Sequence, residues 1–387
     1  MSVGRETLKF FIPCVSIMGV GSHTEVPSLF IERGCKKPLI VTDKMMTQLG
    51  VTQQFIDLMK KVGITPIVYD ETVPNPTDNN VMKGVDVYKG HDCDSIMTLG
   101  GGSPHDCGKG IGIVVTNGGI INDYEGVDKS KNRMPPFIAV NTTAGTASEM
   151  TRFCIITDTK RHVKMAIVDW RTTPDVAVND PELMVGMPPS LTAATGMDAL
   201  THAVEAYVSI IATPITDSCA FKAIELISQN LRAAVAFGKD MVARDKMAYA
   251  EYLAGMAFNN ASLGYVHAMA HQLGGLYNLP HGVCNAILLP HICKFNLIAK
   301  VDRFADIARA MGLNIEGVST RRAADMAIEA IQQLSRDVGI PANLTQLGVK
   351  EQDLKTMSEN AQKDACSFTN PRTATLQDII NIYKGAL

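Results

Sequence analysis

Asp94-Ser-Ile-Met-Thr-Leu-Gly-Gly-Gly-Ser-Pro-His-Asp106 predicts a buried strand that turns through three glycines into a helix. Glycines allow the backbone to approach a diphosphate closely, and the free N–H groups at a helix start favour binding of that anion. The run matches neither the GxGxxG pattern nor a Walker A loop. A tight strand-to-helix turn that needs a positive φ is therefore the alternative to a phosphate site.

The sequence on either side of this run alternates short apolar segments with amphipathic ones. Residues 38–42, 64–69 and 136–140 are typical of strands, whereas residues 51–62 and 81–89 have helical spacing. Strands that alternate with helices at these intervals indicate βαβ units. We therefore expect a parallel sheet in an α/β domain.

The second half of the chain is predicted to be helical. Residues 191–311 are rich in Ala, Leu and Met at helical period, and residues 315–339 and 376–387 are also helical in pattern. In the run Met187-Pro-Pro-Ser190, the prolines end one element, and Ser190 is the expected N-cap of the next helix. We expect an α/β domain over residues 1–188 and an all-α domain over residues 189–387.

Composition narrows the class of protein. The 387 residues are 46% hydrophobic and 19% charged, which is enough apolar material for a large core. The net charge of −3 comes without a basic run, so a nucleic-acid partner is not expected. The nine cysteines are scattered, odd in number and without a CxxC pair. This usage indicates reduced thiols, and neither a disulfide framework nor a thiolate zinc site.

Targeting and membrane segments are also not expected. Residues 1–11 carry Arg5, Glu6 and Lys9 and lack the long apolar segment of a signal peptide. No stretch reaches about 18 uninterrupted apolar residues. We therefore predict no membrane span and a cytoplasmic protein.

The predicted helical domain carries the strongest chemical signal. Asp198 and His202 are four residues apart, as are His267 and His271, so each pair shares one face of a helix. His281 follows in a Pro-His-Gly run. Imidazole nitrogen and carboxylate oxygen are ligands for divalent transition metals. The alternative is that these side chains are buried polar residues satisfied by ordinary hydrogen bonds.

Two weaker candidates follow predicted strands. Asp43 is placed either to bind a ribose diol or to cap the next helix, and the cap is the simpler role. Asn141-Thr-Thr-Ala-Gly-Thr-Ala-Ser-Glu149 offers hydroxyls and a glycine to a polar ligand, or is an ordinary capped turn. No partner at ligand spacing is found for His23, His91, His162 and His291.

Four segments together resemble the iron-containing (group III) alcohol dehydrogenases. They are the glycine run 100–106, the threonine-rich run 141–149, the stretch Ala194-Thr-Gly-Met-Asp-Ala-Leu-Thr-His202, and residues 267–281. The likeness runs from about Phe11 to the C-terminus, in the order and spacing of the family. Within the family the pattern is similar to that of lactaldehyde reductases, 1,3-propanediol dehydrogenases and NAD-dependent methanol dehydrogenases.

The resemblance implies a dinucleotide-binding α/β domain, an α-helical metal domain, and an active site in the cleft between them. Asp198, His202, His267 and His281 would bind one divalent metal, iron(II) by the family's name, with zinc as the second candidate. His271 would lie beside the substrate and nicotinamide and relay a proton. The residues implied to line the NAD cleft are Asp43, Asn75, Gly101, Gly102, Ser103, Thr142, Thr143, Thr146 and Lys164. Those implied to lie near the substrate are Phe153, Phe258 and Cys366.

The implied activity is the reversible, NAD-linked oxidation of small primary alcohols or diols to aldehydes. The resemblance also implies a homodimer or a larger homo-oligomer. The β-prone run Phe10-Phe-Ile-Pro13 is a candidate for pairing across a subunit boundary, because an exposed strand edge would otherwise favour aggregation.

Three other interpretations stay open. A dehydroquinate synthase-like enzyme has the same scaffold but binds a bulky phosphorylated acid, which calls for several basic residues near the metal. Arg152 and Lys164 are the nearby basic residues that the sequence offers. The other two are a metal- or nucleotide-binding protein without turnover, and a hydrolytic metalloenzyme in which the glycine run is only a turn.

Overall fold

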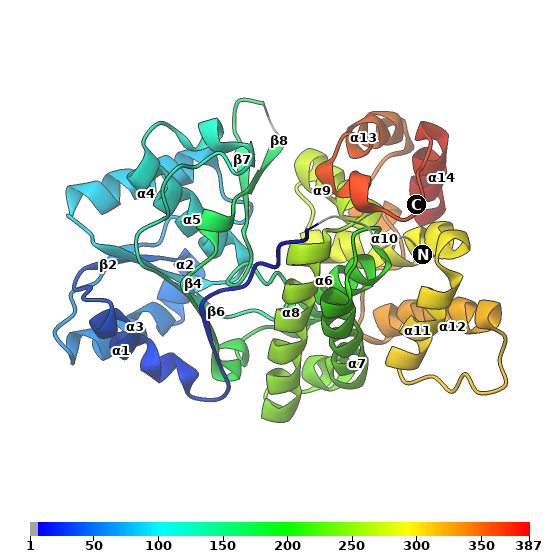
Figure 1. The fold of residues 1–387 in the computed structure, drawn as a ribbon, viewed down its shortest axis with the longest axis horizontal. Helices are drawn as coiled ribbons and strands as arrows, with labels where there is room; N and C mark the ends of the chain where they lie inside the picture. Colours follow the sequence, from blue (N-terminus) through cyan, green and yellow to red (C-terminus); the bar gives the residue numbers. More distant parts are fainter. Residues whose placement is uncertain (1–6, 162) are drawn as a thin grey trace.

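The computed structural model of the chain describes residues 7–161 and 163–387. Residues 1–6, which include much of the charged N-terminal segment considered above, and His162 lie outside the described residues. Two parts lie next to each other along the longest axis of the molecule (Figure 1). The N-terminal part contains the strands, and the C-terminal part is helical.

A six-stranded parallel sheet forms the centre of the N-terminal part, in the order β1-β9-β6-β4-β2-β3. Its strands are β1 (Val15–Met18), β2 (Pro38–Val41), β3 (Ile67–Tyr69), β4 (Ser95–Gly100), β6 (Phe137–Asn141) and β9 (Val176–Asn179). The four strands predicted from sequence are β2, β3, β4 and β6, and they are neighbours in the sheet. The α/β class is therefore confirmed, and β1 and β9 extend the sheet beyond the prediction.

Helices cover both faces of this sheet, as a parallel sheet requires. They are α1 (Val26–Glu32), α2 (Lys44–Gln48), α3 (Val51–Lys60), α4 (Asp78–Gly90) and α5 (Gly102–Asn117). Leu39 and Val41 of β2 face the core under α4 and α5, whereas Ile40 faces the core under α1 and α3. Because both faces are buried, the strands read as continuous apolar runs and do not alternate.

A second, three-stranded sheet was not predicted. It contains β5 (Gly126–Val127), β7 (Phe153–Asp158) and β8 (Val163–Val168), in the order β5-β8-β7, with β7 and β8 antiparallel. Residues of β7 alternate between buried and half-buried positions. Cys154 and Ile156 face the core under α5, which holds this sheet against the α/β part.

The C-terminal part is built from helices. They are α6 (Pro189–Val208), α7 (Pro214–Ala236), α8 (Met241–Ala261), α9 (Tyr265–Tyr277), α10 (His281–Asn296), α11 (Val301–Ala310), α12 (Thr320–Asp337), α13 (Leu354–Ala361) and α14 (Leu376–Ala386). One continuous apolar core joins them. Helices α6 and α8 lie on the side of this part that faces the sheet (Figure 1).

The start of α6 corrects one prediction. Ser190 is not the N-cap, because Pro188 occupies that position and Pro189 is the first helical residue. Proline suits the first helical position, since its fixed φ is helical and no N–H partner is needed there.

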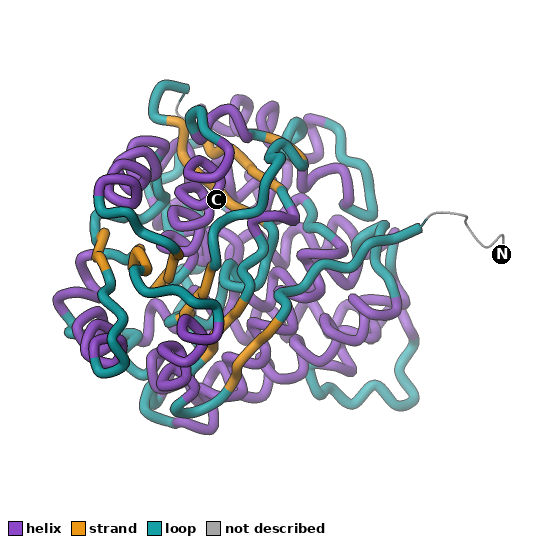
Figure 2. Tube along the Cα trace, turned by 60° about the vertical axis from the view of Figure 1, so that its left-hand side comes forward, coloured by secondary structure: helices purple, strands orange, loops and turns teal. Residues whose placement is uncertain are grey.

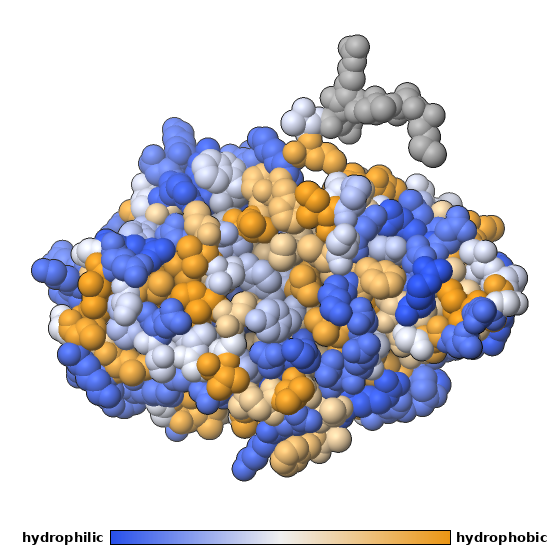
Figure 3. All heavy atoms as spheres, turned by 60° about the horizontal axis from the view of Figure 1, so that its bottom comes forward, coloured by the Kyte–Doolittle hydropathy of each residue, from blue (hydrophilic) through white to orange (hydrophobic). Residues whose placement is uncertain are grey.

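Within residues 7–161 and 163–387, one helical segment has the length and composition of a membrane span. It is His281–Ala299, and 61% of its most apolar window is buried in the structure. A core helix of a soluble protein meets the same test, so the segment is weak evidence for a span. On the face shown in Figure 3, exposed apolar side chains are interspersed with polar ones.

The N-terminal run Phe10-Phe-Ile-Pro13 approaches β1 as a loop (Figure 2). The backbone of Phe11 binds the side chains of Asn259 and Asn260 at the end of α8.

Candidate functional site

Three predicted metal ligands from three different helices converge. Asp198 of α6, His267 of α9 and His281 at the start of α10 place one donor atom each within 4.8 Å of one another. Asp198 Oδ1 lies 3.8 Å from His267 Nε2 and 3.8 Å from His281 Nε2. His202 lies at the edge of this group, with its Nε2 3.9 Å from Asp198 Oδ1.

Hydrogen bonds at the far nitrogens fix the direction in which two of these rings point. His202 Nδ1 donates to the carbonyl oxygen of Gly145 at 3.2 Å. His267 Nδ1 donates to Glu205 Oε2 at 2.6 Å. In both rings the Nε2 lone pair is therefore left facing Asp198, which is the tautomer that a metal ligand needs.

The cluster is rich in acceptors and poor in donors. The amide nitrogen of Asn285, which carries two hydrogens, lies 2.7 Å from Asp198 Oδ1 and 3.1 Å from both His267 Nε2 and His281 Nε2. Three acceptors thus point toward one small region that holds a single amide donor. Such an arrangement fits a cation better than a satisfied polar core.

The charge states of the three histidines agree with this interpretation, whereas burial raises the pKa of Asp198, so a bound cation would be needed to favour its carboxylate form. Burial lowers the pKa of His202. Burial and the neighbouring histidines hold the pKa of His267 well below its usual range. Burial, Lys164 and the neighbouring histidines do the same to the pKa of His281. Neutral imidazole is the form that binds a metal. The residues present therefore fit a divalent transition ion held by one carboxylate and three imidazoles.

The predicted cofactor residues gather where β4 ends and α5 begins. Gly100 has φ 146° and α5 starts at Gly102, so the turn does need positive φ and also opens a helix. A Cβ at Gly101 would stand 2.8 Å from Thr143 Oγ1, and one at Gly102 would stand 3.0 Å from Thr146 Cγ2. The threonine-rich loop therefore packs directly on the glycine turn. Ser103 lies in the first turn of α5, and the N–H of Thr142 donates to the Gly100 carbonyl at 3.0 Å.

Asp43 takes the simpler of its two predicted roles in this structure. It is the N-cap of α2, and its Oδ1 accepts the N–H of Met46 at 2.9 Å.

Two other predicted cofactor residues face the helical part. Asn75 Nδ2 donates to Asn278 Oδ1, at the end of α9, over 3.0 Å. Lys164 of β8 reaches α9, because a Cβ at Gly274 would stand 3.4 Å from its Nζ. Burial lowers the pKa of Lys164, against the opposing effects of Asp106, Cys284 and Asp198.

The predicted substrate residues lie beside two different histidines, the phenylalanines next to His202 and Cys366 next to His271. Phe258 of α8 stacks on His202 with ring centroids 4.2 Å apart, and Phe153 of β7 lies 5.9 Å from Phe258. His271 Nδ1 lies 2.8 Å from Asp364 Oδ2, and Cys366 completes a group of donor atoms within 4.8 Å of one another. Burial and Asp364 raise the pKa of the Cys366 thiol well above its usual value, so it is not a thiolate nucleophile.

Sequence reasoning missed the residues that support the ligands. Glu205 lies one turn after His202 on α6, and Asn285 lies one turn after His281 on α10. Both have helical spacing from a predicted ligand, so the pattern could have indicated them. Asp364 carries no such signal, because it reaches His271 from 93 residues away.

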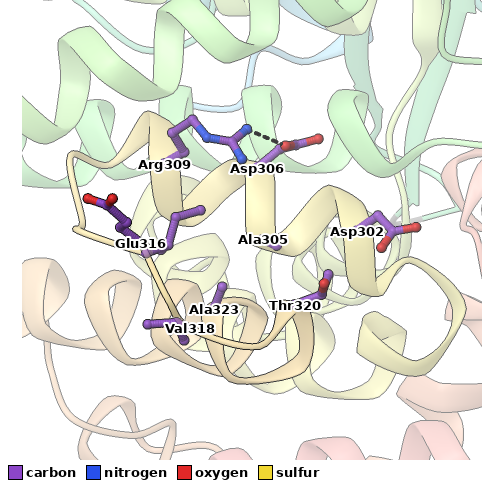
Figure 4. A pocket seen from close by; sticks show the side chains of 9 residues that line it. Asp302, Ala305, Asp306, Arg309, Glu316, Val318, Thr320 and Ala323 are labelled. Carbon is purple, nitrogen blue, oxygen red and sulfur yellow. Dashed lines mark hydrogen bonds and ion pairs between the residues drawn. The ribbon is translucent and has the colours of Figure 1, made fainter.

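A surface pocket of about 500 Å³ lies elsewhere, between α11 and α12. Asp302, Asp306 and Glu316 line it together with Arg309, which pairs with Asp306 (Figure 4). None of the predicted site residues lines this pocket, so we do not assign it to the site.

Comparison with known proteins matches both parts of the chain to one protein family. Residues 13–181 match the family model described as iron-containing alcohol dehydrogenase, and residues 192–387 match the model of the C-terminal region of the same family. The 1,3-propanediol dehydrogenase of Citrobacter freundii is 53% identical over 379 residues, which cover 97% of this chain and 98% of that protein. The NAD-dependent methanol dehydrogenase of Bacillus methanolicus is 48% identical over 378 residues, which cover 98% and 99%.

Solved structures agree with this placement. A crystal structure of a 1,3-propanediol oxidoreductase superposes with a TM-score of 0.97 at 53% identity, covering 99% of this chain and 100% of that chain. The predicted resemblance and the predicted fold class are confirmed. The chain belongs to the iron-containing alcohol dehydrogenase family.

Proposed function

We propose that this chain interconverts small primary alcohols or diols and their aldehydes, with NAD as the redox partner and iron(II) as the metal. The observation that carries the proposal is the convergence of Asp198, His267 and His281 on one donor-poor region. His202 completes the proposed ligand set from the adjacent turn of α6. The 1,3-propanediol and methanol dehydrogenases among the relatives support a short alcohol as substrate.

The metal would act as a Lewis acid at the substrate oxygen, and nicotinamide would accept or donate the hydride. The chain itself supplies position. Glu205 and the Gly145 carbonyl hold the rings of His267 and His202 with their Nε2 atoms inward. The glycine turn and the start of α5 offer backbone N–H groups to a diphosphate.

His271 is the proposed proton relay. Its Nδ1 is bonded to Asp364, so Nε2 is the nitrogen free to take a proton from a substrate hydroxyl or from water. Phe153 and Phe258 form an apolar wall beside His202, which limits water and favours a small, partly apolar substrate.

The remaining cofactor contacts are proposed from the same positions. Thr142, Thr143, Thr146, Gly101, Gly102 and Ser103 would line the diphosphate side of the cleft, with Asp43, Asn75 and Lys164 around the rest of the dinucleotide. Cys366 would lie near the substrate. We further propose the division into domains 1–188 and 189–387, which the last strand at Asn179 and the start of α6 at Pro189 support.

A homo-oligomeric, cytoplasmic enzyme is also part of the proposal. The backbone of Phe11 is held by α8, whereas Ile12 is 47% exposed, which leaves one edge of the N-terminal run open to a second subunit. Sedimentation of the chain lacking residues 1–12 tests this role, and an unchanged oligomer would exclude it.

The dehydroquinate synthase-like alternative finds little support. The Arg152 guanidinium lies 4.3 Å from the centre of the Phe11 ring and 5.9 Å from that of Phe153. It is therefore engaged with aromatic faces, and of the two predicted basic residues Lys164 alone is placed to bind an anionic substrate at the metal.

The experiment is an anaerobic NADH absorbance assay of the Fe(II)-loaded protein with a panel of short alcohols and aldehydes. Asp198→Ala and His267→Ala are expected to lose metal and turnover together, whereas His91→Ala, on the end of α4, keeps both. Parallel loading with Zn(II) identifies the active metal.

Other results would favour the alternatives. Metal and NADH binding without turnover on any substrate would indicate a binding protein. Metal binding without NADH binding would indicate a hydrolytic enzyme.

A further inference from the structure

The loop between β6 and β7, residues 142–152, touches both halves of the proposed site. On one side, Thr143 and Thr146 pack against Gly101 and Gly102 at the start of α5. On the other side, the Gly145 carbonyl accepts the Nδ1–H of His202 at 3.2 Å. A shift of this loop would therefore disturb the cofactor turn and a metal ligand at once.

The corner of this loop is held in an unfavourable backbone conformation. Ala147 is fully buried and has φ 51°, a left-handed value that a residue with a Cβ rarely adopts. Such a conformation persists only where surrounding contacts over-determine it. Contacts from outside the loop must therefore hold Ala147 in this backbone conformation.

The fixing group comes from the helical part. Glu251 of α8 accepts the N–H of Ala147 through its Oε1 atom. One turn later on the same helix, Gly255 leaves room for the Ala147 methyl group, because a Cβ at position 255 would overlap it. Helix α8 thus holds the corner both by a hydrogen bond and by close packing.

Glu251 belongs to a buried polar group with no access to solvent. Asn141 Nδ2, at the end of β6, lies 3.4 Å from Glu251 Oε1 and donates to the Thr143 carbonyl at 2.7 Å. Asn179 at the end of β9 donates to Glu149 Oε1 at 3.1 Å. The Oε2 atoms of Glu149 and Glu251 have no hydrogen-bond partner among the described residues. Burying two carboxyl groups costs desolvation free energy. The pair is therefore not explained by stabilisation of the fold alone.

We propose that Glu251 is a positioning residue that fixes the loop 142–148, and through it sets the threonines on the glycine turn and the carbonyl that orients His202. The inference rests on the proposed function, because it assigns the two faces of the loop to cofactor and metal. We therefore expect the length of the side chain at position 251 to matter more than its charge, because the side chain must extend far enough to accept the Ala147 N–H.

Two conservative variants separate reach from charge. Glu251→Gln keeps the length and an acceptor oxygen but removes the ionisable group, whereas Glu251→Asp keeps the carboxyl and shortens the side chain by one methylene. Glu225→Asp on α7, where the side chain pairs with Lys222 at the surface, is the matched control. Thermal unfolding of each protein reports any general loss of stability.

The readouts are binding measurements. NADH affinity is followed by fluorescence in the metal-free protein, and the metal site by the absorption spectrum and chelator competition of bound Co(II). For Glu251→Asp we expect NADH and Co(II) each to bind about tenfold more weakly, the change expected for loss of one buried hydrogen bond. Glu251→Gln is expected to stay close to the unaltered protein in both measurements.

Three results would overturn the inference. The first is unaltered NADH and Co(II) binding by Glu251→Asp. The second is a larger loss of affinity in Glu251→Gln than in Glu251→Asp. The third is an equal loss of affinity in both variants that is explained by their lower unfolding temperatures. If the unaltered protein bound Co(II) but no NADH, the proposed function would fail, and the Co(II) spectra of the variants would still decide the role of Glu251.

Discussion

His271 Nδ1 lies 2.8 Å from Asp364 Oδ2, although 93 residues separate the two in the sequence. Asp364 Oδ1 also accepts the N–H of Cys366 at 2.9 Å, so the carboxylate is held from two sides. Burial raises the pKa of Asp364, but the His271 ring and the Cys366 N–H outweigh burial and lower it overall. The side chain is therefore a carboxylate at neutral pH, and it fixes His271 with the proton on Nδ1.

Asp364→Asn is expected to lower kcat about 10²-fold, the usual scale of a lost acid–base contribution. An asparagine can offer its NH₂ to Nδ1, which would move the proton to Nε2 and remove the free acceptor. NADH affinity should change little, because the hydrogen bonds of Asp364 go to His271 and Cys366 and not to the glycine turn. Asp325→Asn, at an exposed ion pair with Arg321 on α12, is the control. An unchanged kcat in Asp364→Asn would exclude His271 as the relay in this tautomer.

The sequence could place Asp198 beside His202 because their spacing is local. Asp198 and His202 lie on consecutive turns of α6, and helical periodicity brings them to one face. The central strands were found for a similar reason, since each is a short apolar run that needs no knowledge of its neighbours. Family resemblance then supplied the pairing of α6 with α9 and α10.

What escaped prediction depends on contacts between distant residues. The β7–β8 hairpin has few buried positions, and it becomes recognisable only when α5 covers one face. In the sequence, Glu251 resembles any other acidic residue on a helix. Its contact with Ala147 could not be predicted, because an alanine gives no sign that its φ is positive. The prediction for Ser190 was wrong because a serine is a common N-cap, whereas here the helix begins one residue earlier, at Pro189, with Pro188 as the N-cap.

Gly282→Ala is expected to weaken metal binding by an order of magnitude or more. A Cβ at this position would overlap the backbone carbonyl of Ala194 and stand 3.4 Å from Asp198 Cβ, so α10 could not keep its distance from α6. His281 precedes this glycine and would move away from Asp198. Gly275→Ala on α9 is the matched control, because nothing lies within 4 Å of its Cβ, and alanine there should be neutral or slightly stabilising. Chelator competition with Co(II) measures both variants, and equal affinities would contradict the predicted overlap.

Lys109→Met is expected to destabilise the fold by about 3–5 kcal/mol, the range for removing one partner of a buried charged pair. Lys109 is fully buried, and its Nζ donates to the carbonyls of Thr151 and Phe153 at 2.8 Å each. It also faces Asp106 and Glu149, whose charges oppose the lowering of its pKa by burial. Methionine fills the same space but leaves these acceptors without a donor.

The control for this change is Lys83→Met, at an ion pair with Glu71 on the surface of α4. An exposed pair of this kind contributes about 0–1 kcal/mol, so the control should unfold at nearly the same urea concentration as the unaltered protein. Equal midpoints for Lys109→Met and Lys83→Met would show that the buried ammonium group is dispensable.

Glu251→Gln is expected to make stability less sensitive to alkaline pH. Burial raises the pKa of both Glu251 and Glu149, and the Glu149 carboxyl raises that of Glu251 further. A raised pKa means that the folded state retains protons that the unfolded state has released. Stability therefore falls as pH rises above the ordinary glutamate value, by at most about 1.4 kcal/mol per pH unit for each retained proton. A glutamine at position 251 removes one of these protons and eases the ionisation of Glu149.

Urea unfolding at about pH 6 and about pH 8 measures the effect, with the difference between the two pH values compared across variants. The histidines are the same in both proteins, so their contribution cancels in this comparison. The unaltered protein should lose more stability over the interval than Glu251→Gln does. Equal losses would mean that the two buried carboxyl groups ionise in the folded protein as readily as in the unfolded one.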